Sequence, residues 1–177
     1  MKKLSPLSSP WLTGFFVILL AAACDSGSDE MSTKDKLLGT WTVSTVSIDA
    51  TVGAQSVVDY LVNVVGLSPT DAAVQYGVYE TFLKSEITGS ITFKSDMTYE
   101  SNFGTSGPED GTWSLSPDEK TLTLDEGTAD ETELTLNSIT GSTLAVTFTQ
   151  NLMEDLDDEP TTPDVTIKTE AEVTLTK

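Results

Sequence analysis

The sequence predicts a mainly β protein: an eight-stranded antiparallel up-and-down barrel with two short helices inserted between strands one and two. From Leu37 to the C-terminus, apolar and polar residues mostly alternate with a period of two, which is typical of half-buried strands. Connections after the second strand are mostly short and carry turn-forming residues, so consecutive strands are expected to pair antiparallel. Eight amphipathic strands must bury one common face and protect two edges, and closure into a barrel does both.

Each expected strand is defined by the positions of its apolar residues. In the first strand, Trp41 and Val43 share one phase of the alternation, whereas Val46 and Ile48 share the other, which predicts a β-bulge near 44–45. The last strand alternates most regularly along its whole length. The expected strands span 40–49, 87–94, 98–103, 111–116, 120–125, 132–139, 143–150 and 165–176.

The segment between the first two strands follows a helical period instead. Apolar residues recur at helical spacing over 57–65. A second helix start follows at Ser68-Pro69-Thr70-Asp71, with a capping Ser, Pro at the first helical position and an acid in the first turn. Its apolar face continues to Leu83, so we expect the helices of 57–83 to lie over one end of the barrel as a lid.

The N-terminus predicts an export signal. Met1-Lys2-Lys3 precedes nine apolar residues at 15–23, and a helix needs about 20 such residues to cross a bilayer. The alternative, an uncleaved short anchor, is disfavoured by the abrupt polar stretch from Asp25 onward. We expect a lipoprotein signal peptide at 1–23, a flexible acidic tether at 24–36 and a folded domain at 37–177.

The end of this apolar run, Leu20-Ala21-Ala22-Ala23-Cys24, resembles the lipobox of bacterial lipoproteins. The resemblance implies cleavage before Cys24, attachment of lipid such as palmitate to its thiol, and a place in the bacterial cell envelope. We expect an anchor in the outer membrane, with the domain facing the periplasm or the cell surface.

Charge and composition exclude several classes of function. Without residues 1–23, seven basic residues face 28 acidic ones, so the net charge is 7 − 28 = −21. A surface of this charge repels phosphate backbones, so no nucleic-acid partner is expected. The chain has one Cys and no His, which excludes an internal disulfide, a Ser-His-Asp triad, a Cys-His pair and a His-bound zinc.

We expect no enzyme, no cofactor and no metal. Nearly every Asp and Glu falls in a predicted turn or on an outward strand phase, where a carboxyl keeps an ordinary pKa. An acidic loop at Glu154-Asp155-Leu156-Asp157-Asp158-Glu159 lacks the order of ligands in a calcium loop. A solvated loop is the default interpretation, and a cation or a basic protein bound there is the alternative.

Several short motifs from Leu37 onward resemble the lipocalin-like domains of lipoproteins from Bacteroidetes-type bacteria. Gly39 and Trp41 match the G-x-W that opens a lipocalin barrel. Two departures stand out: Met97 replaces the usual Gly, so the turn there is expected to avoid positive φ, and the chain has no Arg to pack over Trp41. The motifs that carry the resemblance are Leu38-Gly39-Thr40-Trp41, Ile91-Thr92-Phe93-Lys94-Ser95-Asp96, Gly111-Thr112-Trp113-Ser114-Leu115 and Leu122-Thr123-Leu124.

An eight-stranded barrel encloses space for side chains or for one small ligand. We therefore expect either a small apolar ligand inside the barrel or a filled core on a surface module that binds a protein partner. A fatty acid is disfavoured because a buried carboxylate needs a cationic partner, so a neutral or cationic ligand is expected. The candidate ligand-binding residues are Trp41, Phe93, Tyr99, Phe103, Trp113 and Phe148.

Overall fold

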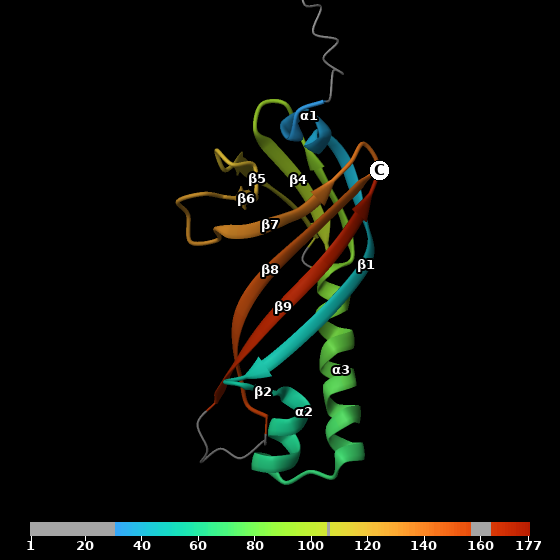
Figure 1. The fold of residues 1–177 in the computed structure, drawn as a ribbon, viewed down its shortest axis with the longest axis vertical. Helices are drawn as coiled ribbons and strands as arrows, with labels where there is room; N and C mark the ends of the chain where they lie inside the picture. The colour runs from blue at the N-terminus through green and yellow to red at the C-terminus, as the bar shows by residue number, and fades with distance from the viewer. Residues whose placement is uncertain (1–30, 106, 157–163) are drawn as a thin grey trace, which may run out of the picture. The chain divides into compact units, whose positions relative to one another are not determined.

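Eight strands close into an antiparallel up-and-down barrel across residues 31–105, 107–156 and 164–177, which are the residues that the computed structural model describes (Figure 1). The barrel closes because the last strand pairs with the first, with Val173 opposite Val46. The predicted fold class is therefore confirmed. In order around the barrel the strands are β1 (Gly39–Val52), β3 (Gly89–Phe93), β4 (Thr98–Phe103), β5 (Gly107–Leu115), β6 (Thr121–Leu124), β7 (Thr132–Ile139), β8 (Thr143–Glu154) and β9 (Val165–Thr176).

Strand β1 carries the predicted bulge. The register of its ladder with β9 shifts between Val43 and Thr45, which moves Ile48 to the buried phase that Trp41 occupies before the bulge. The two-residue strand β2 (Gln55–Ser56) pairs with the far end of β1.

Strands β1, β8 and β9 are longer than the others and continue past the barrel as a three-stranded extension (Figure 1). β8 and β9 pair from Thr143 opposite Thr176 to Glu154 opposite Val165. β3, by contrast, pairs with β1 only from Gly39 to Thr42. One face of the extension therefore needs a cover from outside the barrel.

Helices α2 (Val57–Tyr60), η1 (Leu61–Val65) and α3 (Pro69–Ile87) provide this cover. The Ser68 hydroxyl caps α3 by accepting a hydrogen bond from the amide of Asp71, as the sequence predicts. α3 has 19 residues and is longer than the short helix expected. These helices and the extension enclose a second core, separate from the barrel core, whose buried members are Ala50, Val57, Leu61, Ala72 and Ile167.

The prediction that the helices of 57–83 lie over one end of the barrel as a lid is therefore wrong for most of this segment. The apolar faces of the helices pack on the extension, because β1, β8 and β9 present apolar residues beyond the barrel. Only the last turns of α3 reach the barrel core, through Leu83 and Ile87. No helix among the described residues is both long and apolar enough to cross a membrane.

The folded part begins earlier than predicted. Helix α1 (Thr33–Leu37) lies in the segment expected to be tether, with Ser32 as its cap and Leu37 completely buried. The predicted signal peptide, the lipobox with Cys24 and the tether up to residue 30 lie outside the described residues, as do Asp157, Asp158 and Glu159 of the acidic loop.

The turn between β3 and β4 also differs from its prediction. Met97 adopts a φ of 68°, a left-handed conformation that the absence of Gly was expected to prevent. The surroundings hold it there: the Trp113 amide donates to the Met97 carbonyl at 2.9 Å, and the Met97 side chain packs against the barrel core. Tertiary contacts thus outweigh the local preference at this position.

Candidate ligand-binding cavity

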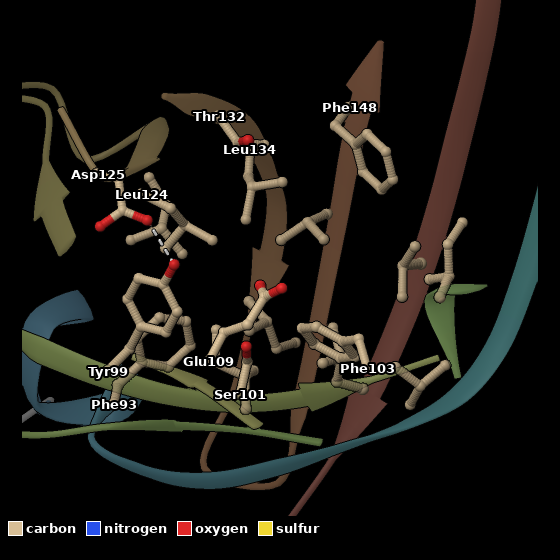
Figure 2. A pocket seen from close by; sticks show the side chains of 18 of the residues that line it. Phe93, Tyr99, Ser101, Phe103, Glu109, Leu124, Asp125, Thr132, Leu134 and Phe148 are labelled. Carbon is tan, nitrogen blue, oxygen red and sulfur yellow. Dashed lines mark hydrogen bonds between the residues drawn. The ribbon is translucent and has the colours of Figure 1, made fainter. Parts of the chain in front are cut away.

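The barrel interior contains a cavity of about 290 Å³. This volume lies just below the range typical of small-molecule pockets, about 300–1,000 Å³. Its walls are mainly apolar side chains from the inward phase of the strands (Figure 2). The interior is therefore not a solid core, which was the alternative to a ligand cavity. Apolar members of the lining include Ile91, Leu122, Leu134, Leu144, Val146 and Val173.

Four of the six aromatic residues predicted to bind ligand line this cavity: Phe93, Tyr99, Phe103 and Phe148. They come from β3, β4 and β8, so barrel closure brings together residues up to 55 positions apart, since 148 − 93 = 55. Their rings contribute to the apolar character of the cavity wall.

Trp113 is placed behind the lining instead of in it. Its ring meets Phe93 edge to face, with centroids 5.6 Å apart and an interplanar angle of 72°. Its indole N–H donates to the Lys94 carbonyl at 3.2 Å. Trp113 therefore supports Phe93 from the side away from the cavity.

Trp41 is also absent from the lining and is fully buried. Its indole N–H donates to the Leu37 carbonyl at 2.7 Å, which joins β1 to helix α1. The Lys177 ammonium lies 4.4 Å from the centroid of the Trp41 ring and donates to the carbonyls of Lys36 and Leu38, both at 2.6 Å. Lys177 thus takes the place over Trp41 that an Arg occupies in typical lipocalins. Although its side chain is exposed to solvent, partial desolvation lowers the pKa of its ammonium.

Tyr99 donates a hydrogen bond from its hydroxyl to Asp125 at 2.5 Å (Figure 2). The other carboxylate oxygen of Asp125 accepts from the amide of Thr112 at 2.9 Å. A Cβ at Gly111 would collide with this carboxylate, so Gly111 makes the approach possible. Burial, and then the hydrogen bond to Asp125, raise the pKa of Tyr99 far above 10.

The cavity also carries acidic side chains. Of the described residues that line it, four are carboxylates and none is a lysine. Glu109 faces the cavity from β5, where it is the ladder partner of the buried Ser101 on β4. An anionic lining of this kind favours a neutral or cationic ligand over an anionic one. The four carboxylates belong to Glu86, Glu109, Asp125 and Asp130.

The family model described as a Lipocalin-like domain matches residues 37–146. The chain belongs to this family. A crystal structure of a DUF4847 family protein from Bacteroides vulgatus is similar to the chain, with 12% sequence identity and a TM-score of 0.36 over 79% of this chain and 92% of that one. None of the proteins with curated descriptions matches it.

In this lipocalin-like domain, sequence reasoning missed the polar residues that the barrel brings to the cavity, of which Glu86, Glu109 and Asp125 are examples. Glu109 lies in Gly107-Pro108-Glu109-Asp110-Gly111, which has the composition of a turn but forms the first half of β5. Glu86 lies just beyond the part of α3 that was expected to face the barrel. Asp125 was expected to end the strand 120–125; it directly follows β6, and its carboxylate accepts a hydrogen bond from the Tyr99 hydroxyl.

The described residues contain no group of three or more His, Cys, Asp or Glu side chains placed to hold a metal ion. Glu154 ends β8 and Leu156 packs on the second core, so the described part of the acidic loop adjoins that core and not the cavity.

Proposed function

We propose that this protein is a lipid-anchored binding protein whose lipocalin-like barrel holds one small apolar ligand. The observation that carries the proposal is the cavity of about 290 Å³, lined by Phe93, Phe103 and Phe148. Burying apolar ligand surface against these rings gains about 25 cal/mol per Å² before the costs of association. The proposal assigns the protein binding and no catalysis.

The direct test is to extract the protein from its own membrane under mild conditions and to weigh it by native mass spectrometry. We expect the mass to exceed that of the lipidated chain by the mass of one bound molecule. Organic solvent should release this molecule, which should be small and apolar. A protein that repeatedly carries no such molecule, and binds none from a lipid extract, would contradict the proposal.

A matched pair of variants connects this result to the cavity. Leu134 and Leu136 face inward from the same strand, β7, but only Leu134 lines the cavity. Leu134→Trp should fill part of the cavity and abolish ligand retention. Leu136→Trp should retain the ligand if both variants remain folded by circular dichroism.

The lipid anchor is supported by the apolar run at 15–23 and by the lipobox-like end at Cys24. Acyl chains would hold the domain at the membrane because each buried CH₂ contributes about 0.8 kcal/mol. We expect Cys24→Ser to move the protein from the membrane fraction to the soluble fraction of the envelope. If the variant remains membrane-bound, the anchor is not on this cysteine.

One observation favours a second candidate function, a non-enzymatic module that binds a protein partner. Val74, Val78 and Phe82 form a stripe along α3 at a spacing of four residues, and they are 63%, 68% and 58% exposed. The same native mass spectrum tests this candidate: a copurifying protein that is lost in Val78→Lys would support it.

A further inference from the structure

Most of the cavity wall is apolar, but one side of it carries polar groups on two neighbouring strands. Ser101 on β4 and Glu109 on β5 are ladder partners, so their side chains leave the sheet on the same face. Figure 2 shows the Ser101 hydroxyl and the Glu109 carboxylate directed to the same space between the aromatic rings. On β5, Glu109 lies midway between Gly107 and Gly111, which have no side chains to fill that space.

Ser101 is only 6% exposed, and no hydrogen bond joins its hydroxyl to another described residue. The hydroxyl is not one of the fully buried unpaired oxygens, which belong to Tyr79 and Thr169, so it opens onto the cavity that Ser101 lines. In an apolar wall such a hydroxyl has few polar neighbours, so a polar group of a bound molecule gains a hydrogen bond there. A hydroxyl has two acceptor lone pairs and one donor, so the position can receive an N–H group from a bound molecule.

The charges around Ser101 select the kind of group that it can receive. Glu86 and Glu109 reach the cavity without a lysine beside them among its described lining residues. Asp125 is already engaged by the Tyr99 hydroxyl and the Thr112 amide. The two lysines nearest to Ser101 in the sequence, Lys94 and Lys84, do not line the cavity. Each forms an ion pair elsewhere, Lys84 with Glu80 and Lys94 with Glu100. The Glu109 side chain is exposed to solvent as well as lining the cavity, and neither of these ion pairs involves its carboxylate, so it can pair with a cation from a ligand.

We propose that the ligand of this cavity is a small amphiphile with one protonated amine. This inference rests on the proposed function, since it specifies the ligand of the same cavity. The apolar part of the molecule packs against Phe93, Phe103 and Phe148, and the ammonium group donates to the Ser101 hydroxyl and the Glu109 carboxylate. An ammonium has three donors and no acceptor, which suits a site with acceptors and negative charge.

Three probes with the same eight-carbon chain test the head group alone: octylamine, octan-1-ol and octanoate. Isothermal titration calorimetry at pH 7 should show octylamine binding about tenfold tighter than octan-1-ol, because hydrogen bonds to a charged group are the stronger ones. Octanoate should show the weakest binding, because its carboxylate faces those of Glu86 and Glu109.

Two variants locate the ammonium group. Glu109→Gln and Ser101→Ala should each weaken octylamine binding by about tenfold or more and leave octan-1-ol binding within about twofold. Asp110→Asn is the matched control: it removes the same charge from the neighbouring residue, which does not line the cavity. It should leave octylamine binding unchanged.

The outcomes separate this inference from the proposed function. If octan-1-ol or octanoate binds as tightly as octylamine, the amine inference is overturned and the ligand-binding barrel stands. If Asp110→Asn weakens octylamine as much as Glu109→Gln does, only the overall charge attracts the amine, and the assigned site is wrong. If none of the three probes binds, the inference and the binding cavity both fail.

Discussion

The Tyr99 hydroxyl meets the Asp125 carboxylate because Gly111, the ladder partner of Tyr99, leaves that space empty. At the scale of single residues, such contacts determine which side chains can ionise. Burial raises the pKa of the Tyr99 hydroxyl, and the hydrogen bond to the negative Asp125 raises it further.

This contact predicts a pH dependence of stability. The Tyr99 pKa is raised in the folded state, so its contribution to the free energy of unfolding is complete below pH 10 and is lost as the pH rises above 10, where the unfolded chain releases the proton first. Tyr99→Phe should therefore make the decline between pH 10 and 11.5 shallower in urea unfolding. It should also cost about 1 kcal/mol at pH 8, where the hydrogen bond is intact. Equal alkaline slopes in the two proteins would contradict this.

A second residue-scale prediction concerns Thr169 on β9. It is buried next to the Tyr79 hydroxyl, and neither of these two hydroxyls has hydrogen-bond geometry with a partner in the part of the chain that the structure describes. Thr169→Val keeps the shape and replaces the hydroxyl by a methyl group, so it should raise the free energy of unfolding by about 1 kcal/mol. Thr169→Ser keeps the hydroxyl and should lower that free energy. A loss of stability in Thr169→Val would show that the hydroxyl is paired with that of Tyr79.

At the scale of elements, the residue after the last strand binds the segment in which the folded part of the chain begins. Lys177 follows β9 directly, and its ammonium joins the carbonyls of Lys36 and Leu38 while it covers the ring of Trp41. The G-x-W motif of β1 therefore depends on a residue more than 130 positions away, since 177 − 41 = 136.

Lys177→Met keeps the apolar stem and removes these hydrogen bonds. We expect a loss of about 1 kcal/mol, which is at the low end for charged hydrogen bonds because the Lys177 side chain is exposed to solvent. Hydrogen exchange of the amides in α1 should accelerate as well. Lys168→Met, an exposed position on the same strand, is the control and should change neither measurement.

At the scale of the whole folded unit, two cores share three strands. The barrel core and the second core are separate clusters, but β1, β8 and β9 run through both. Because β1 and β9 contribute buried residues to both cores, we expect one cooperative unfolding transition.

Ile167→Ala tests this coupling. Ile167 is completely buried in the second core, so its truncation should cost about 3 kcal/mol. In a chain without residues 1–23, the tryptophans are Trp41 and Trp113, both in the barrel core, so their fluorescence reports on the barrel alone. The fluorescence and circular dichroism transitions should shift together. Val64→Ala, at an exposed position of η1, should shift neither, and a fluorescence transition unmoved by Ile167→Ala would show two independent units.

Local patterns in the sequence predicted the strands, the bulge near Ser44 and the cap of α3, because each depends on residues close together in the chain. The aromatic lining was predicted in part: period-two alternation places Phe93 and Trp113 on an inward phase, but it does not say that Trp113 stands behind Phe93.

The sequence by itself thus determined the strands, their antiparallel order and the acidic character of the protein. Only the tertiary structure decided where the helices pack, that Lys177 covers Trp41, and that Ser101 and Glu109 face one cavity. The physical reason is that alternation and turn chemistry act over a few residues, whereas strand length and barrel closure bring together side chains that are distant in the chain.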